Sequence, residues 1–201
     1  MKDFHTTPIT ELAGIIAEHL QKHGIEVVLV GGLAVEVYTE NLYLTKDIDM
    51  VNTNYRPPKH VHAAMAELGF FKQGRVYVNT TTDITVEFPT APLSVGDELI
   101  KSTTHLHVAD RRIPILKVED VVKDRLAAYI HWQDRQSLIQ ATAVIIKHQL
   151  QPDAFKQFCL REGSQQHYQM LEQLHQEASN KQINSMEELE TVLTQILIKQ
   201  I

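Results

Sequence analysis

Apolar positions in the first part of the chain alternate between helical spacing and short β-branched runs. Residues 8–23 carry a helical stripe of isoleucine and leucine, and Gly24 follows at the position where helices commonly end. Residues 25–30 (IEVVLV) form an apolar run of strand length that leads directly into Gly31-Gly32 and a helix-compatible segment, residues 33–41. The pattern therefore predicts a helix, a strand, a glycine turn and a second helix.

Period-two alternation predicts the remaining strands of a mixed sheet. A second strand is predicted at residues 47–51, followed by a helix that begins at Pro57-Pro58 and ends at Gly69. Further strands are predicted at residues 75–79, 83–88, 105–109 and 112–116. We expect the strands at 47–51 and 83–88 to lie side by side.

Helical spacing replaces this alternation from Lys117 onward. Apolar residues continue at helical spacing from Val118 to Ile145, and the last segment, residues 186–201, has an apolar face expected to pack on the bundle or on a partner chain. We therefore expect an α/β (α+β) protein. Its mixed-sheet core would span residues 1–116, and a helical region packed on that core would span residues 117–201.

Composition and charge narrow the class of protein. The 201 residues are 43% hydrophobic and 22% charged, which is typical of a soluble globular protein with a buried core. The N-terminal segment lacks the pattern of a signal peptide, and no apolar run reaches the length of a membrane span, so we expect a cytoplasmic protein. The formal net charge of −6 favours a small nucleotide carried with a metal ion over a nucleic-acid backbone.

Asp47 and Asp49 are the first candidates for chemistry. In a strand, side chains alternate between the two faces, so these two carboxylates project from one face while Ile48 points into the core. Two like charges this close repel each other unless a cation lies between them, and a divalent ion is the natural partner. The alternative is a pair of solvated aspartates at the end of a strand.

Gly31-Gly32 is a candidate phosphate site. Glycine permits close approach to the backbone, and the free N–H groups at the start of the following helix attract phosphate oxygens. The alternative is a tight turn that needs glycine for steric reasons alone. Neither GxxxxGK nor GxGxxG is present in the sequence, so the common phosphate-loop families do not apply.

Glu87 is a candidate third carboxylate. The strand predicted at residues 83–88 places Asp83, Thr85 and Glu87 on one face. If this strand lies beside the Asp47 strand, three acidic oxygens from adjacent strands suit octahedral Mg²⁺, which takes its remaining ligands from water and substrate phosphates. The alternative is an ordinary half-exposed strand.

Together these motifs resemble the nucleotidyltransferase superfold, shared by DNA polymerase β, antibiotic nucleotidyltransferases and AbiEii-type toxins. Residues 27–51 are similar to its strand, glycine turn, helix and Asp-x-Asp strand, with Thr45-Lys46 where such proteins often read Ser-Asp or Thr-x-Asp. Residues 86–98 and 121–141 are similar to uncharacterised bacterial members of the group, and the resemblance covers roughly residues 25–145.

The resemblance implies a set of site residues. Asp47, Asp49 and Glu87 would be catalytic and would bind the metal, with two Mg²⁺ ions expected and Mn²⁺ as a substitute. Residues expected to bind the nucleotide are Gly31, Gly32, Thr45, Lys46 and Lys123. The sequence departs from the family pattern at two of these positions, because Gly32 replaces the usual serine and Glu87 replaces the commoner aspartate.

Residues outside this group carry weaker signals. Lys123 lies in the predicted helix from Val118, where a surface helix with scattered ion pairs is the alternative interpretation. Trp132 is expected to be packed between the two halves, and Cys159 to be a packed thiol. The histidine pairs 60/62 and 105/107 lack the frame of a zinc site and are expected at the surface.

The motifs and the family resemblance lead to two hypotheses about function. The first is metal-dependent transfer of a nucleoside monophosphate from a nucleoside triphosphate to an unknown acceptor hydroxyl on a protein, a transfer RNA end or a small molecule. The alternative is a catalytically weak or inactive nucleotide-binding protein of a toxin–antitoxin type. A homo-oligomer or an antitoxin partner is compatible with either function, and no membrane partner is expected.

Overall fold

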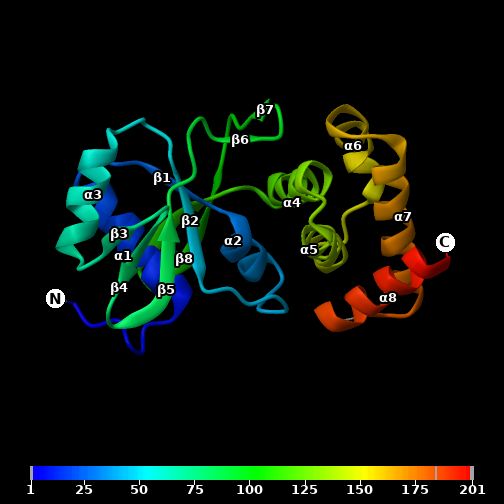
Figure 1. The fold of residues 1–201 in the computed structure, drawn as a ribbon, viewed down its shortest axis with the longest axis horizontal. Helices are drawn as coiled ribbons and strands as arrows, with labels where there is room; N and C mark the ends of the chain where they lie inside the picture. The colour runs from blue at the N-terminus through cyan, green and yellow to red at the C-terminus, as the bar shows by residue number, and fades with distance from the viewer. Residues whose placement is uncertain (1, 184, 200–201) are drawn as a thin grey trace. The chain divides into compact units, whose positions relative to one another are not determined.

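The computed structural model describes residues 2–183 and 185–199 (Figure 1). The chain divides into two compact units. One, called here the sheet unit, comprises residues 1–34, 45–94 and 99–117. The other, called here the helical unit, comprises residues 35–44, 95–98 and 118–201.

The sheet unit is built on a mixed sheet. Within the described residues, seven strands pair in the order β3-β4-β5-β2-β1-β9-β8. Their bounds are Val27–Val30 (β1), Asp47–Asn52 (β2), Phe71–Gln73 (β3), Val76–Asn79 (β4), Thr82–Glu87 (β5), Thr104–Val108 (β8) and Arg111–Ile115 (β9). The central strand β2 pairs antiparallel with β1 and parallel with β5, and β1 pairs parallel with β9. This arrangement puts the glycine turn and both predicted acidic strands at the centre of the sheet.

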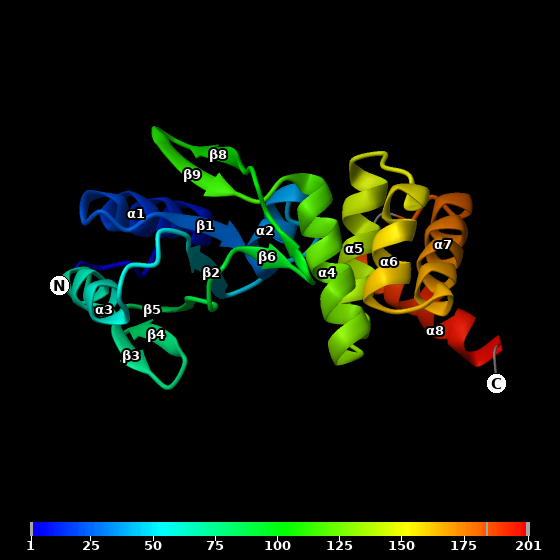
Figure 2. The same ribbon diagram turned by 90° about the horizontal axis from the view of Figure 1, so that it is seen from above.

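Helices α1 (Ile9–Lys22) and α3 (Pro58–Glu67) contact each other and cover the sheet (Figure 2). Leu12, Ile16 and Leu20 of α1 are fully buried, because they recur at helical spacing on the side that meets β1 and β9. On β2, Ile48 and Met50 are also fully buried. The face of the sheet that carries Ile48 and Met50 is therefore the core face.

Helix α2 (Gly31–Tyr38) begins immediately after β1. Gly31 has φ +65°, a left-handed conformation that side chains with a Cβ adopt only with strain. That single residue turns the chain from the extended strand into the helix without an intervening loop. The first turn of α2 belongs to the sheet unit, and residues from Val35 belong to the helical unit.

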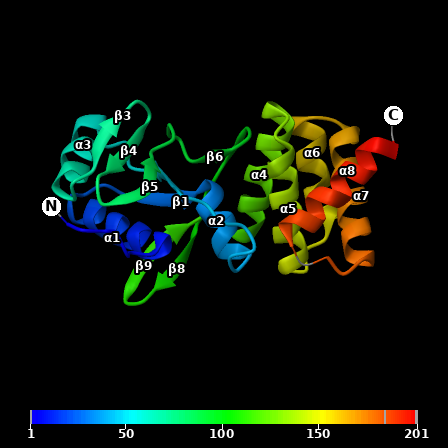
Figure 3. The ribbon, with the colours of Figure 1, turned by 60° about the horizontal axis from the view of Figure 1, so that its bottom comes forward.

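The helical unit is a bundle of packed helices (Figure 3). Its elements are α4 (Val118–Trp132), α5 (Arg135–Lys147), a 3₁₀ turn at Pro152–Phe155, α6 (Lys156–Glu162), α7 (Gln165–Asn180) and α8 (Met186–Lys199). Helix α5 is the central helix, since every residue from Ser137 to Ile145 is buried and the helix contacts α4, α7 and α8. Asp134 caps its N-terminus by accepting a hydrogen bond from the backbone N–H of Gln136.

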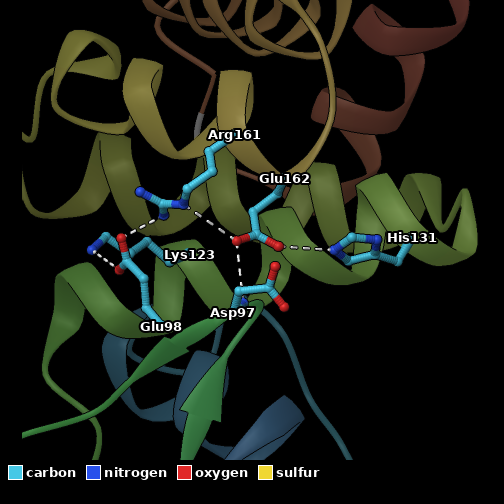
Figure 4. Close-up of polar contacts among 6 residues, drawn as sticks. All are labelled: Asp97, Glu98, Lys123, His131, Arg161 and Glu162. Atoms are coloured by element: carbon cyan, nitrogen blue, oxygen red, sulfur yellow. Dashed lines mark hydrogen bonds and ion pairs between the residues drawn. The ribbon is translucent and has the colours of Figure 1, made fainter.

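A short hairpin of β6 (Ser94–Val95) and β7 (Glu98–Leu99) completes the described elements. Its tip, residues 95–98, belongs to the helical unit. Figure 4 shows how this tip is held. The carboxylate of Glu162, only 2% exposed, accepts a hydrogen bond from the backbone N–H of Asp97 and pairs with His131 at 3.1 Å. Glu98 pairs with Lys123 at 2.6 Å and with Arg161.

The expected fold class is confirmed: a mixed sheet with flanking helices is followed by a helical C-terminal region. The predicted strands and helices are present with ends within a few residues of those expected, and α8 is described to Lys199, so residues 200 and 201 of the expected last helix lie outside the described residues. The division into domains at residue 116 stays a prediction. Trp132 is 81% exposed, so the expectation that its ring is packed was wrong.

Candidate functional site

The register of β2 and β5 brings the predicted carboxylates together. In this parallel pair, Asp47 is opposite Thr85 and Asp49 is opposite Glu87. Register partners in adjacent strands project from the same face of a sheet. Because Ile48 lies on the core face, Asp47, Asp49 and Glu87 share the opposite face of the sheet unit.

The glycine turn meets the same carboxylates. Val30 is the register partner of Asp49 in the antiparallel pair of β1 and β2, so Gly31 follows directly beside Asp49. A Cβ placed on Gly31 would lie 2.3 Å from Asp49 Oδ2, which is far inside van der Waals contact. Val30, Asp49 and Glu87 therefore lie in a row across three neighbouring strands, which are spaced about 4.8 Å apart in any sheet, and Gly31 follows at the end of that row.

Neighbouring side chains hold Asp47 and Lys46 in position. The hydroxyl of Thr85 donates a hydrogen bond to Asp47 Oδ1. The backbone N–H of Asp47 donates a hydrogen bond to Thr45 Oγ1 at 3.1 Å. Lys46 forms an ion pair with Asp83 on β5. The hydrogen bond and charge of Asp83 raise the pKa of Lys46, and those of Lys46 lower the pKa of Asp83. The ammonium of Lys46 is thus held at the carboxylate face by a neighbouring acid.

Arg75 is a residue near the site that the sequence analysis missed. Its Nε atom lies 3.8 Å from Glu87 Oε1, and its side chain is 90% exposed. Arg75 precedes β4, whose Val76 is the register partner of Glu87. The antiparallel pairing of β4 with β5 places this cation beside the third carboxylate, and the short connection between the strands predicted at 75–79 and 83–88 was a signal for that pairing.

Lys123 belongs to the helical unit. Its Nζ atom lies 2.6 Å from a carboxylate oxygen of Glu98 (Figure 4). The same atom lies 5.8 Å from the centre of the Phe158 ring. The first cause of the lowered pKa of Glu98 is the hydrogen bond from Lys123. Lys123 therefore has an internal role in holding the hairpin tip, and its expected contact with a nucleotide stays a prediction.

The three carboxylates share one face of the sheet, although no choice of one oxygen from each brings all three within 4.8 Å of one another. Carboxylate oxygens are the ligands that Mg²⁺ and Mn²⁺ prefer, and an open face leaves room for water and phosphate ligands. Asp47 is exposed, and Asp49 and Glu87 are only partly buried, so the face is accessible from solvent. Such an arrangement can bind a metal-chelated phosphate beside the start of a helix.

A known structure shares this fold. A crystal structure of an antigenic nucleotidyltransferase-like protein from Paracoccidioides brasiliensis matches with a TM-score of 0.54 and 13% identity, over 91% of this chain and 90% of that chain. The crystal structure of ANT(2'')-Ia with adenylyl-2''-tobramycin matches with a TM-score of 0.42 and 11% identity, over 94% and 97% of the two chains. At these identities, the first likeness shows the fold alone.

The comparison with curated proteins found no match. No helix in the described part of the chain is long and apolar enough to cross a membrane. The model of one protein family matches residues 10–176, a stretch that contains β1, the glycine turn and all three carboxylates. The expected nucleotidyltransferase fold is thereby confirmed, and the chain belongs to the family described as nucleotidyl transferase of unknown function (DUF2204).

Proposed function

We propose that this protein is a metal-dependent nucleotidyltransferase that transfers a nucleoside monophosphate from a nucleoside triphosphate to an acceptor hydroxyl. The observation that carries the proposal is the convergence of Asp47, Asp49 and Glu87 on one face of the sheet beside the Gly31 turn. Family membership supports the reaction class.

Asp47, Asp49 and Glu87 would hold Mg²⁺, with Mn²⁺ as a substitute. When bound, such ions would neutralise charge on the triphosphate and stabilise the attacking and leaving oxygens. Asp49 is the central ligand of the three, because it lies in register with Glu87 on one side and next to Gly31 on the other. Thr85 orients the Asp47 carboxylate through its hydroxyl hydrogen bond.

Gly31 and Gly32 would receive the phosphates. The first N–H groups of an α-helix have no partner within the helix, and the positive end of the helix dipole adds attraction for an anion. Lys46 would supply a further positive charge, either from its present position against Asp83 or by exchanging that carboxylate for a phosphate oxygen. The hydroxyl oxygen of Thr45 accepts a hydrogen bond from the backbone N–H of Asp47 and so holds the start of β2.

Glu87 is the proposed proton acceptor. The acceptor oxygen attacks the α-phosphorus and forms a new P–O bond, while the bond to the bridging oxygen of the leaving pyrophosphate breaks. The proton of the acceptor hydroxyl passes to the Glu87 carboxylate. The side chain of Glu87 is 32% exposed, so the proton can then pass to solvent. Protein side chains, transfer RNA ends and small molecules are the candidate acceptors.

One observation favours a second function, a weak or inactive nucleotide-binding protein, such as one member of a toxin–antitoxin pair. Both lysines expected to bind the nucleotide are paired with carboxylates, Lys46 with Asp83 and Lys123 with Glu98. In addition, Gly32 lacks the hydroxyl that a serine would offer to a phosphate.

The test measures both the binding of Mg²⁺ with a nucleoside triphosphate and the transfer of a labelled nucleotide. Mg²⁺ and a nucleoside triphosphate together should raise the melting temperature more than the sum of their separate effects, because each completes the site of the other. Asp49→Asn should abolish this synergy, whereas the control Asp110→Asn, at a side chain 91% exposed in the β8–β9 turn, should retain it. Transfer of label from an α-³²P triphosphate to a cell-extract component by wild type, but not by Asp49→Asn, establishes the enzyme.

Two other outcomes separate the alternatives. Synergy without labelling favours the binding protein. Absence of both, with all four triphosphates and with Mn²⁺ in place of Mg²⁺, refutes the proposed site.

A further inference from the structure

Two histidines and a glutamate form a second cluster of metal-binding side chains in the sheet unit. His19 and His23 lie four residues apart on one side of α1, with His23 at its C-terminal cap, and Glu67 is the last residue of α3. One ligand atom from each residue lies within 4.8 Å of the other two. The described residues contain no other such group of three.

Two of the three distances within this cluster are close to those of a tetrahedral metal site. His23 Nε2 lies 3.1 Å from Glu67 Oε2, and His19 Nε2 lies 3.6 Å from the same oxygen. A metal ion with ligands at about 2.0–2.1 Å and tetrahedral angles holds neighbouring ligand atoms about 3.4 Å apart. The two separations from Glu67 lie on either side of this value, and all three ligand atoms lie within 4.8 Å of one another, so an ion could bind after side-chain movements.

The surrounding structure fixes the two rings. The rings of His19 and His23 are in contact, with 4.6 Å between their centres. His19 is 17% exposed, and its Nε2 atom hydrogen-bonds to the backbone carbonyl of Ala64 on α3 at 2.9 Å. Coordination through this nitrogen would exchange that hydrogen bond for a metal bond. His23 and Glu67 are 37% and 57% exposed, so water can supply a fourth ligand.

This cluster is separate from the three carboxylates. α1 and α3 contact each other on the core face of the sheet, whereas Asp47, Asp49 and Glu87 project from the opposite face. The ligand chemistry also differs, because two imidazoles and one carboxylate prefer a transition metal such as Zn²⁺, and three carboxylates prefer Mg²⁺ or Mn²⁺.

We propose that His19, His23 and Glu67 form a binding site for Zn²⁺ or a similar divalent transition metal. The ion would cross-link α1 to α3 and stabilise the sheet unit. Two histidines one helical turn apart can chelate a single ion, and a third ligand from another helix couples metal binding to the packing of the two helices. The site does not depend on the nucleotidyl-transfer activity.

Metal titration of the untagged chain without nucleotide tests the site. Zn²⁺ should bind with one ion per chain and raise the melting temperature by roughly 5–11 °C once free Zn²⁺ is about 100-fold above its dissociation constant. Co²⁺ should give the strong visible absorption of a tetrahedral site. His23→Gln and Glu67→Gln change half-exposed side chains, so both variants should fold and both should lose these signals.

Two matched variants act as controls. His60→Gln changes an exposed histidine on the same helix as Glu67 and should bind Zn²⁺ as wild type does. Asp49→Asn should also retain Zn²⁺ binding, so failure of the nucleotide site and failure of this site are distinguishable. Wild-type protein without a Zn²⁺ effect overturns the proposal, and so does an unchanged effect in His23→Gln and Glu67→Gln.

Discussion

Asp49 on β2 and Glu87 on β5 are register partners in a parallel strand pair. Their carboxylates are therefore positioned by backbone hydrogen bonds between two central strands and not by a flexible loop. A site built on such strands is rigid before any ligand arrives, which lowers the entropy that binding must offset.

Glu87→Gln should separate binding from chemistry. The amide keeps the shape and one oxygen ligand but cannot accept a proton. We expect transfer of a labelled nucleotide to fall about 10²–10⁴-fold, the usual contribution of a general base. Much of the thermal stabilisation by Mg²⁺ and triphosphate should remain. Equal loss of stabilisation and transfer would make Glu87 a metal ligand only, and Glu87→Asp should restore part of the activity.

Gly31→Ala tests the contact between the turn and Asp49. The new methyl group would lie 2.3 Å from Asp49 Oδ2 and would also be strained at φ +65°. Gly74→Ala is a matched control, since Gly74 has φ +63° and no atom within 4 Å of the added Cβ. We expect Gly74→Ala to cost about 1–2 kcal/mol from left-handed strain alone. Gly31→Ala should cost more in chemical denaturation and should abolish the metal–nucleotide synergy.

Asp83→Asn should strengthen triphosphate binding. The change releases Lys46 from its ion pair, so the ammonium can turn to a phosphate. Calorimetry should give a dissociation constant a few-fold lower than in wild type, whereas Lys46→Gln should raise it and Asp110→Asn should leave it unchanged. Weaker binding in Asp83→Asn would mean that the ion pair positions Lys46 for the nucleotide.

The Lys46–Asp83 ion pair should weaken as the pH falls. Lys46 holds the pKa of Asp83 below its ordinary value, so the pair is intact above that ordinary value and is lost as the pH falls through the lowered one. The advantage of Asp83→Asn in triphosphate binding should therefore shrink in acid, when Asp83 in the wild type is protonated. Calorimetry of both proteins across this range checks the sign.

Glu162→Ala should destabilise the hairpin tip. The backbone N–H of Asp97 would lose its acceptor, and His131 and Arg161 would lose a buried partner. We expect a loss of about 1–3 kcal/mol in chemical denaturation. Gly96→Ala should also be destabilising, because its Cβ would lie 2.4 Å from Glu162 Oε2. In the double variant Glu162→Ala, Gly96→Ala, the added methyl group no longer meets the Glu162 carboxylate. The loss of unfolding free energy should therefore be smaller than the sum of the losses in the two single variants.

Cys159 should report unfolding of the helical unit. Burial raises the pKa of its thiol to about 11, and the side chain has no exposed surface. Because the thiolate is the reactive form, alkylation at neutral pH should be very slow in the native protein. Alkylation should accelerate in Glu162→Ala if the tip supports the bundle, and it should be unaffected in Gly74→Ala.

The sequence predicted those parts of the fold and site that depend on local periodicity. Alternation around Asp47 and within β5 predicted which side of each strand carries the carboxylates, whereas their proximity also depends on the pairing of β2 with β5. The hairpin strands β6 and β7 were missed because each has only two residues, too few for a period. β3 was missed because all of its residues are exposed.

The second cluster could not be predicted, because its third ligand comes from another helix. His19 and His23 are four residues apart, but neither their spacing nor their neighbours indicates that Glu67 will lie beside them. Similarly, the pairing of Lys46 with Asp83 depends on the adjacency of β2 and β5. Contacts of this kind depend on which elements pack together, a property that periodicity within one segment does not contain.

The chain crosses between the two units at 34/35, 44/45, 94/95, 98/99 and 117/118. Residues 35–44 are tied to α5 through the Glu40–Lys147 pair, and residues 95–98 to α4 and α6 through Glu98 and Glu162. Neither unit is thus a single contiguous stretch of the gene. In a fragment that ends after Lys117, Glu40 and Glu98 would lose their lysine partners Lys147 and Lys123. The sheet unit therefore cannot be isolated with all its contacts by truncation at one point of the chain.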